Sequence, residues 1–430
     1  MTPARIAELF SQPLTINKLI LANRVVMGPM AANAPTKAGG PSEQTIAFYE
    51  ARAKGGVGMI IAGGIVATKR SILEAPAKTS LRFDTDELIP DLRRVADAVH
   101  AHDVPIIAEF IPGFGRMGRP GPGRPLISAS PKNVVIPEDR FPVGMYVPGG
   151  QVTPMPEEAT IEEIETYERE MIEAAVRACK AGWDGVELAF HMSYFGSSFL
   201  APRVNWRTDE YGGSAENRAR TIVNTITGIR AKLGRDFVIG VRMQADDYIP
   251  ESQGAEGFAE VAKVVEEAGI DYFALSPACY ETMDVNASAK DGVLVKDGVA
   301  RVFRDALSVP IIVQGQHKPA NAAEVLERGL GDLVSFARQS LADPEIGNKI
   351  TSGRANQVTR CVRRNDCVKR MVFGFEVRCP VNPNMGRESR KAGTLPPAKR
   401  LFQVPVEKAI MRLTGSKALM GLAGKLSRKK

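Results

Sequence analysis

The sequence predicts a (β/α)8 TIM barrel followed by a small cysteine-containing extension and a basic tail. Eight short, apolar, β-branched runs occur between residues 24 and 338, and amphipathic helical stretches separate most of them. Alternation of strands and helices produces right-handed crossovers and a parallel sheet. Eight units favour a closed barrel over an open doubly wound sheet. An open sheet would normally carry a Gly-rich turn after its first strand, and MGPMAANAP is not such a turn.

The eight predicted strands are continuously hydrophobic, as strands buried on both faces are. In chain order they are RVVMGPM (24–30), VGMIIAGG (57–64), PIIAEF (105–110), GVELAF (185–190), FVIGVRM (237–243), YFALSP (272–277), PIIVQG (310–315) and LVSFAR (333–338). The clearest helices between them are 42–56, 85–103 and 161–182. Ser or Thr caps at two of their starts and Gly at two of their ends support these helices.

Two segments do not fit the alternation. Residues 111–159 are rich in Pro and Gly and follow the third strand, so they lie on the C-terminal face of the barrel, where active sites are built. A cover over the pocket is favoured there over a disordered surface insertion. The second segment begins near residue 345. We therefore expect a barrel at 1–345, a cysteine-containing extension at 346–390 and a basic tail at 391–430.

Composition and charge narrow the class of protein. Hydrophobic content of 44% and charged content of 24% are ordinary for a soluble globular protein. The first residues contain no long apolar run, which leads us to expect a cytoplasmic protein. Residues 387–430 hold 12 Lys and Arg against 2 acids, whereas the net charge of the whole chain is +7. Because the positive charge belongs to the tail and not to the core, nucleic acid is not expected as a partner.

The tail has apolar residues at roughly helical spacing, namely Ile410, Leu413, Leu419, Leu422 and Leu426. Such a segment can lie on an anionic membrane or dock on an acidic partner. Gly residues within it weaken a lone helix, so a flexible, solvated tail is favoured.

The predicted strand ends point to a phosphorylated ligand. Gly315 closes the seventh strand and Ala337–Arg338 closes the eighth, which suits the phosphate site typical of these barrels. Arg242, inside an apolar strand, would be costly to bury without an anionic partner. The alternative for Arg242 is an ion pair with Asp246 or Glu187. The chain has no catalytic triad, Walker motif or HExxH, so hydrolase and kinase functions have no residues to support them.

Three of the five cysteines lie within residues 361–379. In a reducing compartment, clustered cysteines are more often metal ligands or redox groups than disulfides.

Five stretches make the chain resemble the old yellow enzyme superfamily of flavin-dependent ene-reductases: LANRVVMGPM, GGVGMIIAGG, AGWDGVELAF, NWRTDEYGGSAENRAR and DLVSFARQSLADP. Within it, the resemblance is greatest to the barrel half of 2,4-dienoyl-CoA reductase and related NADH:flavin oxidoreductases. The stretches cover residues 21–344. The resemblance implies FMN at the barrel mouth, NADH or NADPH as the reductant and a small-molecule substrate.

The resemblance also implies site residues. Gly28, Pro29 and Met30 would contact the isoalloxazine, and Arg242 would stabilise negative charge on the reduced flavin. The full set of implied FMN contacts is Gly28, Pro29, Met30, Gly63, Glu109, Arg242, Gln314, Gly315, Gln316, Ala337 and Arg338. Tyr194 falls at the proton-donating tyrosine and Tyr280 at a catalytic His position after the sixth strand. The implied reaction moves a hydride from flavin N5 to the β-carbon of an electron-poor alkene while Tyr194 protonates the α-carbon.

The chain departs from the family pattern at several positions. Ala189 and Met192 replace the usual substrate-gripping His or Asn pair, and His191 between them is expected to point elsewhere. Glu109 replaces a Gln near the pyrimidine ring, where it can accept from N3–H but repels O2. These departures leave three functions open: reduction of an enone or enoyl thioester, dehydrogenation or demethylation of an amine, and a flavin-binding electron-transfer or scaffold protein with weakened catalysis.

The cysteines also fit the resemblance. In the dienoyl-CoA reductase group, C-x₂-C-x₃-C-x₁₁-C binds a [4Fe-4S] cluster, and Cys361, Cys367 and Cys379 match the first, third and fourth ligands. Arg364 stands near the missing second ligand. A three-cysteine cluster, a zinc site with an outside ligand and plain thiols remain alternatives, with loss of the cluster favoured. A retained cluster would imply a separate electron-donor protein, because the family's FAD and NADPH modules are not seen after residue 390. The sequence leaves open whether the protein forms a homo-oligomer.

Overall fold

The computed structural model describes residues 1–287, 290–389, 404–416 and 418–420. Its centre is a closed, all-parallel barrel whose eight strands are joined in the order β10-β11-β12-β13-β14-β3-β4-β5. These strands are β3 (Val25–Met30), β4 (Met59–Val66), β5 (Ile106–Ile111), β10 (Gly185–Phe190), β11 (Val238–Asp246), β12 (Tyr272–Pro277), β13 (Ile311–Gln314) and β14 (Leu333–Phe336). Each coincides with a run predicted from hydrophobicity, and the barrel confirms the predicted fold class.

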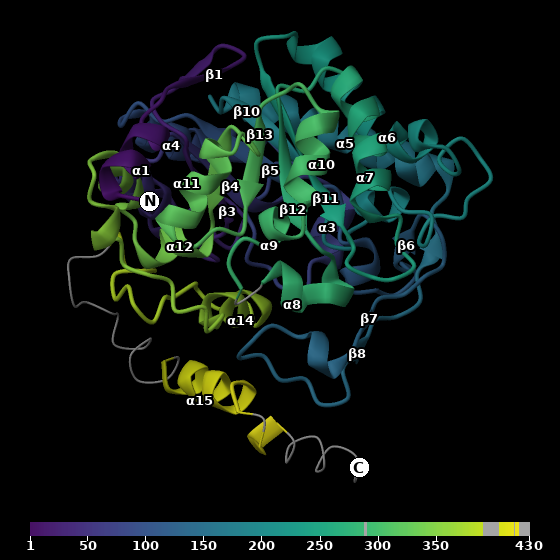
Figure 1. Cartoon of the computed structure of the whole chain (residues 1–430). Coiled ribbons are helices and arrows are strands. Elements are labelled where there is room, and N and C mark those ends of the chain that lie inside the picture. The colour runs from purple at the N-terminus through teal and green to yellow at the C-terminus, as the bar shows by residue number, and fades with distance from the viewer. Residues whose placement is uncertain (288–289, 390–403, 417, 421–430) are drawn as a thin grey trace.

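Helices surround the barrel on its outside (Figure 1). The main ones are α1 (Pro3–Phe10), α2 (Glu43–Lys54), α4 (Ile89–His100), α5 (Ile161–Lys180), α6 (Ala215–Leu233), α7 (Gly254–Glu267), α10 (Val299–Ala306), α11 (Pro319–Glu327), α12 (Arg338–Ala342) and α13 (Ile346–Thr351). Thr160 and Glu163 form a capping box that starts α5 as the sequence predicts. Helix α4 starts at Ile89 and not near residue 85, because Asp86–Leu88 forms a short 3-10 turn and Pro90 fits the start of a helix.

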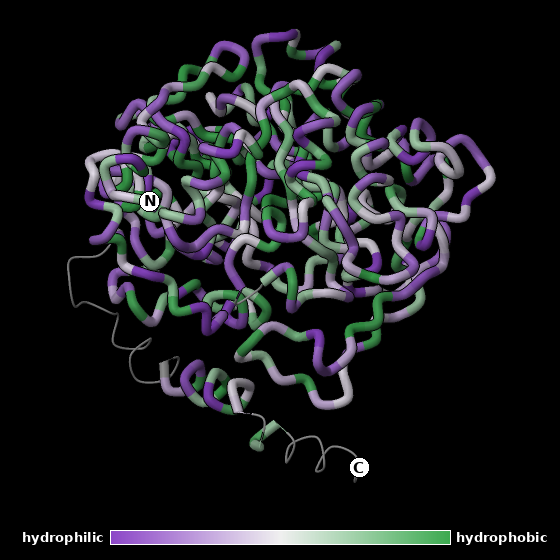
Figure 2. Tube along the Cα trace, viewed as in Figure 1, coloured by the Kyte–Doolittle hydropathy of each residue, from purple (hydrophilic) through white to green (hydrophobic). Residues whose placement is uncertain are grey.

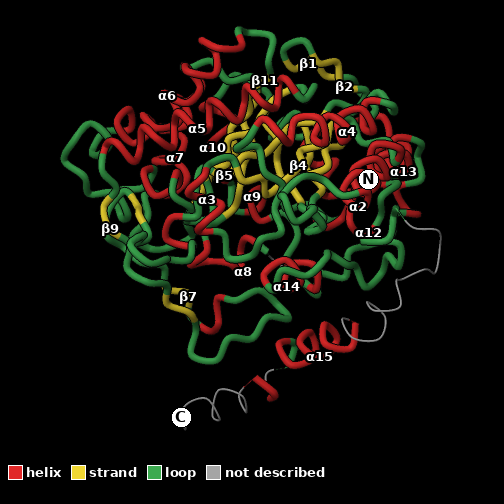
Figure 3. The backbone as a smooth tube through the Cα atoms, turned by 180° about the vertical axis from the view of Figure 1, so that it is seen from behind, coloured by secondary structure: helices red, strands yellow, loops and turns green. Residues whose placement is uncertain are grey.

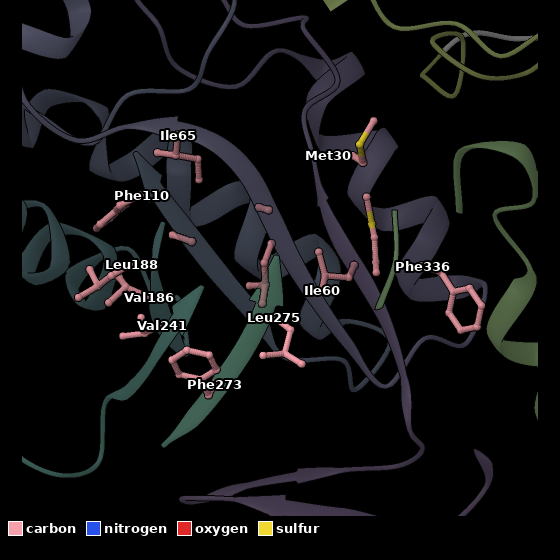
Figure 4. Close-up of a cluster of buried hydrophobic side chains, with 14 of the residues drawn as sticks. Met30, Ile60, Ile65, Phe110, Val186, Leu188, Val241, Phe273, Leu275 and Phe336 are labelled. Carbon is pink, nitrogen blue, oxygen red and sulfur yellow. The ribbon is translucent and has the colours of Figure 1, made fainter. Parts of the chain in front are cut away.

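The main hydrophobic core lies between the strands and these helices. Figure 4 shows outward-facing strand residues of this layer, including Ile60, Val186, Val241, Phe273 and Phe336. Figure 2 shows hydrophobic segments running through the middle of the molecule. Burying such side chains stabilises the fold by about 1.5–3 kcal/mol each.

Inward-facing residues change character along the strands. Near the strand starts they are apolar and pack with a hairpin of β1 (Leu14–Ile16) and β2 (Leu19–Leu21). Two residues further along, the inward positions hold a set that we call the polar layer: Glu109, Glu187, Arg242, Gln314 and Ser335. Because successive side chains on a strand point to opposite faces, these five share the inside of the barrel at its C-terminal end.

The excursion after β5 is ordered and lies at the end of the barrel opposite the β1–β2 hairpin (Figures 1 and 3). It contains β6 (Ile127–Ser128), β7 (Val135–Ile136), β8 (Gln151–Val152) and β9 (Glu157–Glu158), paired β6 with β9 and β7 with β8. Val134, Ile136 and Phe141 bury their side chains against Met283 of the loop after β12. The excursion therefore packs onto the loops that follow the barrel strands.

The segment after the barrel also lies at this end, with α14 (Asp366–Val372) as its helix (Figure 1). The backbone N–H of Val377 donates to the Ala32 carbonyl at 3.1 Å, and Arg52 of α2 donates to Glu388 at 2.6 Å. Helix α15 (Val404–Thr414) follows and contacts α14 through an ion pair between Arg370 and Glu407.

Part of the predicted basic tail, residues 404–416, thus packs against the extension through α15. Glu407 is 9% exposed because it pairs with Arg370, and Figure 2 shows hydropathy alternating along α15. Leu422 and Leu426 lie outside the described residues. None of the described helices combines the length and apolar character needed to cross a bilayer.

Candidate active site

Arg242 occupies the centre of the polar layer. Its Nε donates to Glu187 at 2.7 Å and its Nη1 donates to the Gln314 side-chain oxygen at 2.7 Å. The arginine side chain is 1% exposed, and that of Glu187 is 0% exposed. Of the two ion-pair partners considered from the sequence, the structure selects Glu187 over Asp246. Arg242 thereby places a fixed positive charge inside the barrel, next to the C-terminal ends of the strands.

Glu109 and His191 lie beside this arginine. Glu109 accepts from the Gly64 backbone N–H at 3.1 Å through Oε2, whereas its Oε1 is 3.4 Å from Arg242 Nε. The Nε2 of His191 is 3.7 Å from the same Oε1, and its Nδ1 is 2.9 Å from the Ser276 hydroxyl. His191 therefore points into the site, contrary to the expectation that it points elsewhere. The turn that follows explains this orientation, because Met192 and Ser193 both have positive φ.

The pKa values of this group reflect burial and close charges. Burial raises the pKa of Glu187 to about 7, although Arg242 opposes the rise. Burial also favours a higher pKa for Glu109, but the contact with His191 and the charge of Arg242 outweigh it and hold that pKa below its usual value. Burial lowers the pKa of His191, which keeps the imidazole neutral.

Two tyrosines from different loops meet beside the polar layer. The hydroxyls of Tyr194, after β10, and Tyr280, after β12, are 3.1 Å apart. The Tyr194 ring packs edge-on against Tyr280 at 5.7 Å, Phe114 at 5.7 Å and His191 at 6.1 Å between ring centroids. Burial raises the pKa of Tyr194 well above its usual range, so its hydroxyl keeps its proton and can donate it. The structure brings together the two predicted catalytic residues.

A buried ionic network that sequence reasoning missed fixes these two loops. Ser193 donates to Glu281 at 2.7 Å and accepts from the Tyr280 backbone N–H at 3.2 Å. Glu281 also pairs with Arg116 at 3.2 Å and with Arg203 at 3.3 Å. These residues come from loops far apart in the sequence, and no local pattern signals their meeting.

A small electropositive cavity of about 10 Å³ lies at the ends of β13 and β14. Its lining includes Lys290, Gln314, Gly315, His317 and Arg338. Gly315 has φ +90°, and a Cβ built on it would meet nothing within 4 Å. The buried Gln316 Nε2 has no hydrogen-bond partner among the described residues. A cationic lining with an unsatisfied buried donor suits a phosphate.

The glycines predicted to contact the ligand have packing roles in the structure. A Cβ on Gly63 would lie 2.5 Å from the Pro29 carbonyl carbon and 2.7 Å from the Met30 amide nitrogen. One on Gly28 would collide with the Ser335 hydroxyl and lie 3.2 Å from the Ala337 Cβ. Both positions therefore require glycine for close strand packing at the barrel mouth, whatever they contact there.

Cys361, Cys367 and Cys379 line one small cavity of about 20 Å³, together with Arg338, Arg363 and Arg364. Burial raises the pKa of Cys367 to about 12, which opposes the thiolate form that metals bind. No group of three or more His, Cys, Asp or Glu side chains in the described part of the chain is placed to hold a metal ion. The function proposed below therefore assigns no part to an iron–sulfur cluster.

Comparison with known proteins gives a family match over most of the chain. The model of the NADH:flavin oxidoreductase / NADH oxidase family matches residues 8–357. A NADH oxidase of Thermoanaerobacter brockii is 32% identical over 423 residues, which are 97% of this chain and 61% of the relative. An N,N-dimethylglycine/sarcosine dehydrogenase of Chromohalobacter salexigens is 30% identical over 388 residues, 88% of this chain and 53% of the relative.

Among solved structures, a 2-naphthoyl-CoA reductase in complex with 2-naphthoyl-CoA superimposes with a TM-score of 0.78 at 25% identity. The match covers 91% of this chain and 59% of that protein. The chain therefore spans little more than half the length of these relatives.

Proposed function

The chain belongs to the NADH:flavin oxidoreductase / NADH oxidase family, as its resemblance to the old yellow enzyme superfamily predicted, and from this premise we propose that it reduces an activated C=C bond with FMN and NADH or NADPH. The expected substrates are enones or enoyl thioesters. The single observation that supports this proposal is the part-buried Tyr194–Tyr280 pair, whose hydroxyls are 3.1 Å apart at the edge of a polar layer centred on Arg242.

The residues at the barrel mouth fit FMN. At the phosphate end, the backbone of Gly315 and the side chains of Gln316 and Arg338 provide donors for an anion. At the ring end, Arg242 provides a positive charge, and Glu109 Oε1 is a buried acceptor that lacks a hydrogen bond. When bound, FMN supplies hydride transfer.

The tyrosines supply and orient a proton. The hydroxyl of Tyr194 is expected to donate its proton to the substrate carbon next to the electron-withdrawing group, while Tyr280 orients that hydroxyl. Ala189 and Met192 cannot donate to a substrate carbonyl, so the two tyrosines and the neighbouring His191 are the described side chains that we expect to donate there. Phe114 packs against the Tyr194 ring and shields part of it from solvent.

An absorbance spectrum of anaerobically purified protein tests cofactor binding, and enone reduction by NADH or NADPH tests the reaction. Resolved flavin bands are expected, and a colourless, folded protein would refute the proposal. Tyr194→Phe should lower the rate about 10²–10⁴-fold while the flavin stays bound. Tyr146→Phe, a part-exposed tyrosine of the excursion, serves as the control. An unchanged rate in Tyr194→Phe would remove this residue from the mechanism.

Amine dehydrogenation is a second candidate, favoured by the aromatic group at the mouth. Phe114, Tyr194 and Tyr280 form a chain of edge-on contacts, and aromatic faces of this kind attract alkylammonium groups. A relative that covers most of this chain is an N,N-dimethylglycine/sarcosine dehydrogenase. Anaerobic bleaching of the flavin by a secondary amine, without bleaching by NADH or NADPH, would favour this function over C=C reduction.

A further inference from the structure

We propose that Glu109, Glu187 and Arg242 form a buried proton-uptake site, which binds one proton from solvent each time the flavin is reduced. This inference rests on the proposed function, because it needs a flavin next to Arg242. It goes further by assigning a task to Glu109, the residue that departs from the family pattern, and to its partner Glu187.

The charge balance of the group motivates the proposal. Glu109 Oε1 is 3.4 Å from Arg242 Nε, and Glu187 Oε1 is 2.7 Å from the same nitrogen. Two carboxylates thus share one guanidinium, and all three side chains are at most 7% exposed. With both carboxylates ionised, the buried group carries one uncompensated negative charge. Like charges this close cannot both stay ionised without cost, so one proton is readily accepted between them.

The groups that face this pair do not supply the missing positive charge. His191 contacts Glu109 at 3.7 Å, and burial lowers its pKa, so it is neutral. The tyrosines near the pair are Tyr49 of α2, Tyr194 after β10 and Tyr272 of β12, and burial raises the pKa of each. Gly64 and Gln314 contribute only uncharged hydrogen bonds. Among the described groups around the pair, Arg242 is therefore the one positive charge that balances the two carboxylates.

Reduction of a flavin in this position adds negative charge beside Arg242. A hydride from NADH or NADPH brings two electrons and one proton to the flavin, so its charge becomes more negative by one. That charge competes with Glu109 and Glu187 for Arg242 and raises the proton affinity of the carboxylates. One proton from solvent then binds to the pair and restores the charge of the site. Reoxidation releases the same proton, so the cycle balances.

The raised pKa of Glu187 sets the pH range in which the pair takes up its proton. Its pKa is raised to about 7 before any flavin charge is added, and an added negative charge moves it upward. Uptake therefore operates from neutral to mildly alkaline pH. Below this range the pair already holds its proton, and well above it the pair binds none in either redox state.

The test measures the midpoint potential of the bound FMN against pH in the full chain. Each proton coupled to a two-electron reduction contributes about 30 mV per pH unit. Wild-type protein should show a slope near about 60 mV per pH unit from neutral to mildly alkaline pH, because flavin and protein each bind one proton. Glu109→Gln and Glu187→Gln each leave one carboxylate against Arg242, and each should lower the slope to about 30 mV per pH unit.

The control is Glu168→Gln, a buried carboxyl of α5 whose pKa is also raised to about 7 by burial but which lies outside the polar layer, bonded to Asn224. It should keep the wild-type slope. If one of the polar-layer variants fails to bind flavin, the other still gives the answer. A flavin-bound wild type with a slope of about 30 mV per pH unit, or variants that keep the wild-type slope, would overturn the inference. A wild type that binds no flavin would instead overturn the proposed function.

Discussion

The ion pair between Arg52 and Glu388 should hold the extension on the barrel. Arg52 lies on α2 with its side chain 0% exposed, and its Nη1 donates to Glu388 Oε1 at 2.6 Å. Truncating Glu388 to Ala leaves this guanidinium buried without its carboxylate. Breaking a buried pair in this way costs about 3–5 kcal/mol. Arg52 keeps the Phe48 carbonyl at 3.0 Å and the Phe48 ring at 4.3 Å, so we expect the lower end of that range.

A loss of about 3 kcal/mol raises the unfolded fraction roughly a hundredfold, which urea titration followed by circular dichroism measures as a lower midpoint. Arg5→Ala, which breaks an exposed pair with Glu327, should leave the midpoint unchanged. The double change Arg52→Met with Glu388→Met should recover much of the loss, because no buried charge remains. A wild-type midpoint for Glu388→Ala would refute the reasoning.

Two further predictions concern the site loops and the barrel mouth. Although burial opposes this shift, the charges of Arg116 and Arg203 lower the pKa of Glu281 from 4.5 to about 2. The ionised carboxylate therefore stabilises the folded protein at pH values above its unfolded pKa, and this stabilisation is lost as the pH falls through the folded pKa. Glu281→Gln should cost about 3 kcal/mol at neutral pH, and the difference from wild type should shrink in acid unfolding titrations; a pH-independent difference would contradict this. Gly63→Ala should destabilise the barrel by about 1–3 kcal/mol in thermal unfolding, because its Cβ would meet the Pro29 backbone at 2.5 Å, and an unchanged melting temperature would contradict that contact.

Much of the fold could be predicted because its signal is local. A run such as PIIVQG is apolar at every position, and this marks a strand buried on both faces without knowledge of its neighbours. The end of such a strand in a barrel is a known place for function, which is why Arg242, Gln314 and Gly315 could be named in advance. The eight strands fall where those runs lie.

The contacts of the site could not be predicted in this way. His191 turns toward Glu109 because the two residues after it have positive φ, and hydrophobic periodicity carries no information about such a turn. Likewise, Ser193 and Glu281 are 88 positions apart in the sequence and meet at 2.7 Å. The cysteine spacing points to a cluster site, yet the arrangement of Cys361, Cys367 and Cys379 in space does not provide one among the described residues.

The sequence by itself therefore determined the barrel, its family and which strand ends carry polar residues. Alternation along a strand has a period of two, so it decides which face each side chain takes. Only the tertiary structure decided which of these side chains touch, because closing the barrel brings Glu109 of β5, Glu187 of β10 and Arg242 of β11 into one layer. The contact of two carboxylates with one arginine arises only when the barrel closes. The distances between these groups depend on strand register and burial, which no single segment of the sequence encodes.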